Sequence, residues 1–183
     1  IVETDNGQVQ GTSVDGMHAF RGIPYAAPPV GERRWQPPAP AADFEILDAA
    51  SYGNQCPQIE TFGVFAAKSF TEDCLFLNVF APASVQPNAK KPVMVWIHGG
   101  GHFNGSGDDY DASKLVLEGD TIVVTLNYRL NVFGFLAHPE LDAEGHAFAN
   151  YGIMDQQAAL RWVQKNIAQF GGDPENVTLF GES

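Results

Sequence analysis

The hydrophobic and polar positions of the first forty residues predict β-structure followed by a shaped loop. From Ile1 to about Phe20, short apolar stretches alternate with turn sequences such as Asp5-Asn6-Gly7 and Asp15-Gly16. This alternation predicts small antiparallel strands joined by tight turns. Residues 21–25 and 28–40 are rich in Pro and Gly and predict an irregular but ordered connection, because proline fixes the backbone and removes a donor.

Further along the chain, the apolar runs become longer and more continuous. Leu75–Phe80 is a strand candidate that Pro82 should stop. Val93–Ile97 and Thr121–Leu126 are apolar throughout, which is typical of central strands of a mostly parallel sheet whose two faces are both covered. We expect residues 111–119 to form the crossover between them.

The last forty residues predict a helix and then a strand. Between Tyr151 and Phe170, apolar residues recur at a nearly helical period, and Gly171-Gly172 supplies a stop. The residues predicted to share one buried face are Ile153, Leu160, Val163, Ile167 and Phe170. Val177–Phe180 reads as a short strand, so the strand–helix–strand order predicts a right-handed parallel crossover in an α/β fold.

Composition limits the class of protein without identifying it. The chain has 183 residues, enough for one domain with a substantial core, and 10 basic against 22 acidic residues give a formal charge of -12. A polyanion would be repelled, so nucleic-acid binding is excluded, and the acidity indicates a solvated surface. No apolar run reaches the length of a membrane span, and residues 1–4 lack a signal-peptide pattern, although a removed signal would leave no trace.

The two cysteines, Cys56 and Cys74, favour a disulfide. Neither stands in a CxxC or His spacing, so a zinc site is not expected, and two reduced buried thiols are the alternative. A disulfide would stabilise the fold by about 3 kcal/mol and would indicate a secreted or periplasmic location, with a cytoplasmic one left open. The loop between them contains Phe62, Phe65 and Phe70, which we expect to fill the core rather than to form a recognition surface.

Two segments at predicted strand ends carry the candidate chemistry. Gly181-Glu182-Ser183 follows a strand and is the first half of a nucleophile elbow, G-x-S-x-G, in which a sharp turn exposes a serine. His98-Gly99-Gly100-Gly101 ends the predicted strand Val93–Ile97, and its glycines would let backbone N–H groups converge on an oxyanion. The alternatives are a loop that needs positive φ angles or a phosphate cradle, and the second is excluded because no Gly-Lys-Ser/Thr follows. Together the two segments predict acyl transfer at a serine.

These motifs, with several others, resemble those of the type-B carboxylesterases, a family that also contains cholinesterases and neuroligins. The resemblance covers the whole chain. The matching stretches are Phe20-Arg21-Gly22-Ile23-Pro24-Tyr25, Glu72-Asp73-Cys74-Leu75-Phe76-Leu77-Asn78, Trp96-Ile97-His98-Gly99-Gly100-Gly101, Asn127-Tyr128-Arg129 and Gly171-Gly172-Asp173-Pro174 through Gly181-Glu182-Ser183. The resemblance implies the α/β-hydrolase fold, with residues 1–183 as the N-terminal portion of a single catalytic domain.

The resemblance also implies roles for individual residues. Ser183 would be the nucleophile that forms the acyl-enzyme, and the backbone N–H groups of Gly100 and Gly101 would be two oxyanion donors, with a third from the residue after Ser183. Glu182 resembles the acidic residue beside the family's nucleophile. Cys56 and Cys74 match the family's first disulfide. No metal or organic cofactor is expected.

The triad of this fold follows the order serine, acid, histidine, so both partners of Ser183 should lie after it. We therefore expect the remainder of the catalytic domain to supply them, and this chain alone to be nearly inactive. The histidines that should not be the general base are His18, His98, His102, His138 and His146. Of these, His98 is expected to shape the oxyanion loop.

The expected substrate is a small-molecule carboxylic ester without charge. Cholinesterases carry a Trp in their cysteine loop that binds quaternary ammonium, whereas residues 56–74 contain none. The sequon Asn176-Val177-Thr178 is discounted because it leads into a predicted buried strand. Two alternatives remain: a neuroligin-like adhesion or binding protein without catalysis, and a pocket that binds an ester without turnover. The retained Ser183 favours catalysis.

Overall fold

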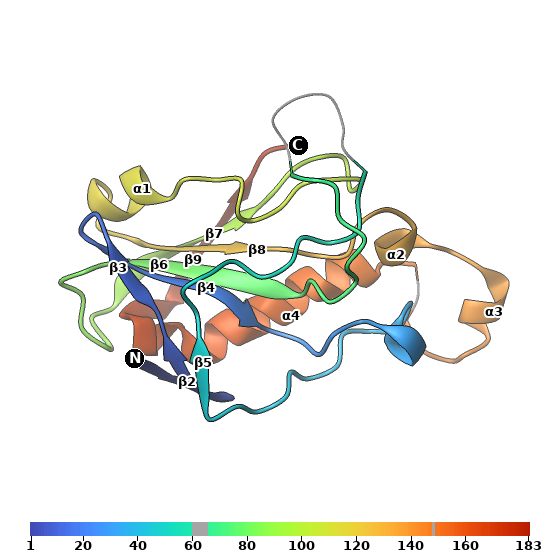
Figure 1. The fold of residues 1–183 in the computed structure, drawn as a ribbon, viewed down its shortest axis with the longest axis horizontal. Coiled ribbons are helices and arrows are strands. Elements are labelled where there is room, and N and C mark those ends of the chain that lie inside the picture. The colour runs from blue at the N-terminus through green and yellow to red at the C-terminus, as the bar shows by residue number, and fades with distance from the viewer. Residues whose placement is uncertain (60–65, 148) are drawn as a thin grey trace.

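The computed structural model describes residues 1–59, 66–147 and 149–183, and Figure 1 shows their arrangement. In chain order the elements are β1 (Val2–Thr4), β2 (Gly7–Gln10), β3 (Thr12–Val14), β4 (Met17–Pro24), η1 (Gly31–Arg33), β5 (Ile46–Asp48), β6 (Phe76–Pro82), β7 (Lys91–Ile97), α1 (Ser113–Leu117), β8 (Ile122–Leu126), α2 (Asn131–Phe135), α3 (Pro139–Asp142), α4 (Tyr151–Asn166), η2 (Ile167–Phe170) and β9 (Gly172–Gly181).

Six strands form the main sheet, in the order β3-β4-β6-β8-β7-β9. The pairings from β3 to β8 are antiparallel, whereas β7 is parallel to both of its neighbours, β8 and β9. The α/β class is confirmed, and the sheet within this chain is mixed rather than mostly parallel. The continuous apolar runs form β7 and β8, which lie inside the sheet, and residues 111–119 contain the short crossover helix α1.

The N-terminal β region is confirmed, with one correction. The turns at Asp5-Asn6 and Asp15-Gly16 join antiparallel strands, and β1, β2 and β5 form a separate three-stranded sheet. The segment from residue 21 to 24 is not an irregular connection, because it continues β4. Its register against β6 shifts between Phe20 and Ile23, where Gly22 has a φ of 69°. A bulge of this kind keeps a Gly- and Pro-containing segment in the sheet.

The sheet is covered on both faces, by α4 on one and α1 on the other (Figure 1). Helix α4 packs Ala159, Trp162 and Val163 against the strands, and η2 adds Ile167 and Phe170. Gly171, with a φ of 91°, ends this helical segment as predicted. The predicted face is wrong at Ile153, which lies outside the core, whereas Leu160 is partly buried and packs against it. Asp155 and Asn166 are buried instead, because each has polar partners inside the protein.

The predicted disulfide is confirmed: Cys56 and Cys74 are joined, with their Cα atoms 4.9 Å apart. The expectation for the loop aromatics is wrong for Phe70, whose side chain is 75% exposed and lies under the ammonium group of Lys68. Phe62 and Phe65 lie outside the described residues.

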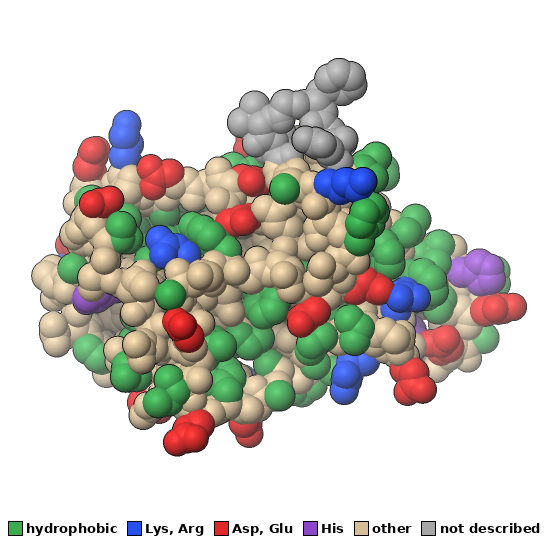
Figure 2. All heavy atoms as spheres, viewed as in Figure 1, with side chains coloured by type: hydrophobic (Ala, Val, Ile, Leu, Met, Phe, Trp, Pro, Cys, Tyr) green, Lys and Arg blue, Asp and Glu red, His purple; other side chains and the backbone are tan. Residues whose placement is uncertain are grey.

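Strand β9 is an edge strand of the described sheet, which corrects the expectation that it is buried. It pairs with β7 alone, Leu179 is 54% exposed, and Asn176 and Thr178 of the sequon are exposed as well. The acidic side chains are scattered over the face seen in Figure 2, with few basic side chains between them. This distribution is typical of a solvated surface.

Candidate active site

The two segments with candidate chemistry meet at one end of the main sheet, where the parallel strands β7 and β9 finish. Strands β7 and β9 are adjacent and parallel, with Ile97 opposite Gly181, so the residues after each strand emerge side by side. A Cβ atom placed on Gly99 would lie 2.4 Å from the carbonyl oxygen of Glu182 and 3.2 Å from Cβ of Ser183. The glycine loop, which we define as residues 98–105, therefore contacts the serine turn, and only glycine fits at position 99.

Both segments hold backbone conformations that few residues adopt. Ser183 is exposed and has a φ of 56°, a left-handed conformation that costs of order 1–3 kcal/mol in a residue with a Cβ atom. Gly100 has a φ of 100°, and a Cβ atom there would lie 2.0 Å from the carbonyl oxygen of Asn104. Gly101 also has a positive φ, of 60°. A strained serine at the end of a strand is the geometry of a nucleophile elbow.

His98 is buried beneath the glycine loop, with 2% of its surface exposed. Its Nδ1 lies 2.8 Å from the carbonyl oxygen of Gly99 and must carry the proton, since a carbonyl can only accept. Its ring stacks on Tyr128 at a centroid distance of 4.4 Å, and the Tyr128 hydroxyl donates to the His98 carbonyl at 2.9 Å. Burial lowers the pKa of His98 to about 4, so the ring is neutral at neutral pH.

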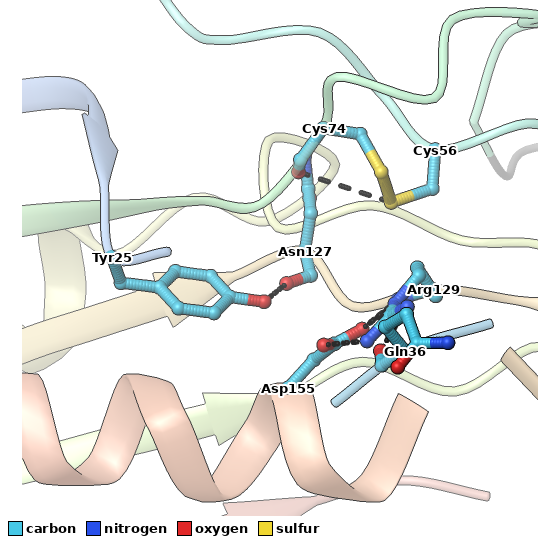
Figure 3. A network of polar contacts seen from close by, with 7 residues as sticks. All are labelled: Tyr25, Gln36, Cys56, Cys74, Asn127, Arg129 and Asp155. Atoms are coloured by element: carbon cyan, nitrogen blue, oxygen red, sulfur yellow. Dashed lines mark hydrogen bonds and ion pairs between the residues drawn. A yellow bond between two sulfur atoms is a disulfide. The ribbon is translucent and has the colours of Figure 1, made fainter. Parts of the chain in front are cut away.

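The triplet Asn127-Tyr128-Arg129 follows β8 and lies at the same end of the sheet; Figure 3 shows Asn127 and Arg129. The Arg129 guanidinium binds both carboxylate oxygens of Asp155 at 2.8 Å and donates to the Gln36 carbonyl at 2.8 Å. Both partners of the ion pair are buried, with 2% and 0% of their side-chain surface exposed. The Arg129 pair therefore fixes the loop after β8 to the start of α4.

Asn127 connects that loop to the segment that follows the glycine loop. Its Oδ1 accepts hydrogen bonds from Gly107 N at 2.8 Å and Ser106 Oγ at 3.1 Å, and its Nδ2 donates to Asn54 O at 3.0 Å. The Tyr25 hydroxyl donates to the Asn127 carbonyl at 2.6 Å (Figure 3). The polar contacts of this triplet could not be predicted from the sequence pattern. The available signal was three polar or aromatic residues directly after a buried strand of the same sheet.

A depression of about 380 Å³ adjoins Ser183. Its lining residues include His98, His102, Tyr128, Ile153 and Glu182. No hydrogen bond joins Ser183 to a histidine within the part of the chain that the structure describes. The remaining histidines have other neighbours: His18 lies 3.0 Å from Ser13 Oγ, His138 accepts from Glu140 N, and His146 contacts Glu144.

Two further properties bear on the kind of site. Within residues 1–59, 66–147 and 149–183 there is no group of three or more His, Cys, Asp or Glu side chains that could hold a metal ion. In the same ranges no helix combines the length and apolarity that crossing a membrane requires.

A strained serine beside a glycine loop, at the edge of a sheet covered by helices on both faces, defines the α/β-hydrolase class. Solved structures agree. A thermophilic p-nitrobenzyl esterase superposes with a TM-score of 0.89 at 48% identity, and a carboxylesterase of Geobacillus stearothermophilus with 0.88 at 46%. Each alignment covers 100% of this chain and 38% or 37% of the other.

The sequence assigns the family within that class. The profile of the Carboxylesterase family matches residues 1–183, and the chain belongs to this family. It is 50% identical to the para-nitrobenzyl esterase of Bacillus subtilis and 46% identical to the fumonisin B1 esterase of Sphingopyxis macrogoltabida. These alignments cover 100% of this chain but only 38% and 34% of the relatives, so the chain spans little more than a third of their length.

Proposed function

We propose that residues 1–183 form the N-terminal part of the single catalytic domain of a serine carboxylesterase, with Ser183 as its nucleophile. The contact between Gly99 and the Glu182-Ser183 turn is the observation that carries this proposal. It places a candidate nucleophile beside a loop of glycines, which is what stabilisation of a tetrahedral oxyanion requires.

The proposed reaction runs through an acyl-enzyme. Ser183 Oγ attacks the ester carbonyl carbon while its proton passes to a histidine base. The carbonyl oxygen becomes an oxyanion, which the backbone N–H groups of Gly100 and Gly101 stabilise together with the N–H of the residue after Ser183. The C–O bond to the alcohol breaks as the histidine returns the proton, and water then hydrolyses the acyl-Ser183 ester by the same route. The acid and histidine of the triad come from the rest of the catalytic domain.

Several properties support this activity over a non-catalytic one. The relatives reported above are named as esterases, and the comparisons do not favour the adhesion-protein alternative. The left-handed φ of Ser183, at the end of a strand that lies beside the glycine loop, is the conformation expected at a nucleophile elbow.

The proposed substrate is an uncharged carboxylic ester. Residues 56–74 contain no Trp that could bind a quaternary ammonium group, and Phe70 projects into solvent rather than filling the core. Because one relative is named a para-nitrobenzyl esterase, p-nitrobenzyl and p-nitrophenyl esters are suitable first substrates.

The proposed location is secreted or periplasmic. A disulfide persists mainly in oxidising compartments, and the Cys56–Cys74 bond supports that setting.

The activity is tested with the full-length protein and p-nitrophenyl acetate. We expect Ser183→Ala to lower kcat/KM by about 10³-fold or more, because the acyl-enzyme can no longer form. Ser84→Ala is the matched control: Ser84 is exposed and follows β6 at the opposite end of the sheet, so its loss should leave the rate unchanged. Equal hydrolysis by the unchanged protein and by Ser183→Ala would refute the proposal.

A further inference from the structure

One side chain, Gln58, joins the disulfide loop, which we define as the segment from Cys56 to Cys74, to the glycine loop. Its Oε1 accepts a hydrogen bond from Gly105 N at 2.8 Å, and its Nε2 donates to Gly105 O at 3.1 Å. The side-chain amide therefore pairs with the main chain of Gly105 as a neighbouring strand would. Gln58 is 4% exposed, so water does not compete for these bonds.

Gln58 is itself held by the disulfide loop, independently of its bonds to Gly105. Its Nε2 also donates to the carbonyl of Cys56, a half-cystine of the disulfide, at 3.1 Å. Its backbone N–H and carbonyl pair with Ser69 at 2.9 and 3.0 Å, and Ser69 Oγ donates to Gln55 O at 2.7 Å. The amide group is thus presented to the glycine loop in a fixed orientation, with both of its N–H groups used.

Gly105 transmits this restraint to the candidate oxyanion donors. A Cβ atom on Gly105 would lie 2.3 Å from His98 Nδ1 and 2.7 Å from Gly99 O, so the end of the glycine loop packs directly on its beginning. Gly99 in turn contacts the Glu182-Ser183 turn. A displacement of Gly105 would therefore move the backbone that faces Ser183.

We infer that Gln58 is a positioning residue for oxyanion stabilisation: it fixes the glycine loop against the disulfide loop so that the N–H groups of Gly100 and Gly101 are preorganised. This inference rests on the proposed function. Preorganised donors act on the transition state more than on the bound ester, since the negative charge develops only there. Loss of Gln58 should therefore lower kcat and leave KM nearly unchanged, whereas loss of a residue that only stabilises the fold would change neither constant of the folded enzyme.

The test uses Gln58→Met in the full-length protein, because methionine keeps the length of the side chain and removes the amide. Direct removal of an oxyanion donor costs about 10²–10³-fold in kcat, and we expect about tenfold for this indirect effect, with KM within about twofold. The inhibition constant of a trifluoromethyl ketone, which forms a tetrahedral adduct with the serine, should rise by the same factor as kcat/KM falls.

Gln55→Met is the matched control. Gln55 lies one residue before Cys56, and its Nε2 also donates two hydrogen bonds, at 3.0 Å, but both go to Asp108 rather than to the glycine loop. Its kinetic constants should stay near those of the unchanged protein. If Gln58→Met has the same kcat and KM as Gln55→Met, the inference is overturned. If the unchanged protein does not hydrolyse esters, the proposed function fails instead, so the two failures are distinguishable.

A second variant keeps the test decisive if Gln58→Met does not fold. Gln58→Glu keeps an acceptor for Gly105 N but loses the donor to Gly105 O unless the new carboxyl group is protonated. Its kcat, taken as a ratio to that of the unchanged protein, should rise as the pH is lowered from about 8 to about 6, because burial raises the pKa of a carboxyl group. A ratio of one at every pH would overturn the inference.

Discussion

At the scale of single residues, the candidate site depends on close packing of main chain rather than on charged groups. Gly99 permits the contact with Glu182 and Ser183, and Gly100 permits the tight return of the loop toward Asn104. His98 fills the space beneath the loop as a neutral ring that donates one hydrogen bond. These features favour a rigid cradle for a developing anion.

Substitution of Gly99 by alanine should separate the glycine loop from the serine turn. Its new Cβ atom would lie 2.4 Å from the Glu182 carbonyl, so one of the two segments must move. We expect kcat on a p-nitrophenyl ester to fall by about 10²-fold in the full-length protein, comparable to the loss of an oxyanion donor. Gly145→Ala is the control: it adds backbone strain, because Gly145 has a φ of 78°, but its Cβ atom would meet nothing within 4 Å, so kcat should stay unchanged. An unchanged kcat for Gly99→Ala would contradict the contact.

His98 should make stability depend on pH. Its pKa is about 4 in the folded protein and 6.5 when unfolded, so the unfolded state binds more protons between these values. The stabilisation is complete above pH 6.5 and is lost as the pH falls toward 4, by about 3 kcal/mol in total. Urea unfolding at pH about 7 and about 4 measures the drop in the free energy of unfolding between these pH values. The drop should be smaller in His98→Gln than in the unchanged protein by that amount. An equal drop in both proteins would show that His98 does not titrate in this range.

At the scale of elements, periodicity predicted the strands β6 to β8 and the helical segment from Tyr151 to Phe170. It placed Ile153 on the wrong face, because Asp155 and Asn166 are buried by polar partners that a hydrophobic pattern does not register. It missed β5, whose exposed Ile46 and Asp48 flank a partly buried Leu47. The roles of Gln58 and Asn127 depend on contacts between segments 47 and 20 residues apart, which local patterns do not encode.

The ion pair between Arg129 and Asp155 should contribute strongly to the free energy of unfolding, because it ties the loop after β8 to α4. Asp155→Asn leaves a buried guanidinium without its counter-charge, and we expect it to lower the free energy of unfolding by about 3–5 kcal/mol. Asp120→Asn, which breaks the solvent-exposed pair with Lys91, should cost less than about 1 kcal/mol. Denaturant midpoints of the two variants check this. Equal shifts of the denaturant midpoint in the two variants would mean that burial of the Arg129–Asp155 pair adds nothing to stability.

At the scale of the whole molecule, the chain corresponds to about 38% of the relatives it resembles. Among the residues that the structure describes, strand β9 pairs with β7 alone, and Leu179 is exposed beside the depression at Ser183. In the proposed function, the rest of the catalytic domain supplies the acid and the histidine to Ser183. The family and fold were predictable because their motifs fall at strand ends, where a sequence pattern and a sheet edge coincide.

The central claim is that Ser183 is an activated nucleophile once the catalytic domain is complete. The most direct test treats the full-length protein with a fluorophosphonate, which phosphonylates activated serines, and locates the adduct by peptide mass spectrometry. We predict a single adduct on Ser183, absent in Ser183→Ala and absent when the 183-residue chain is treated alone. A folded full-length protein that acquires no adduct on Ser183 would contradict the claim.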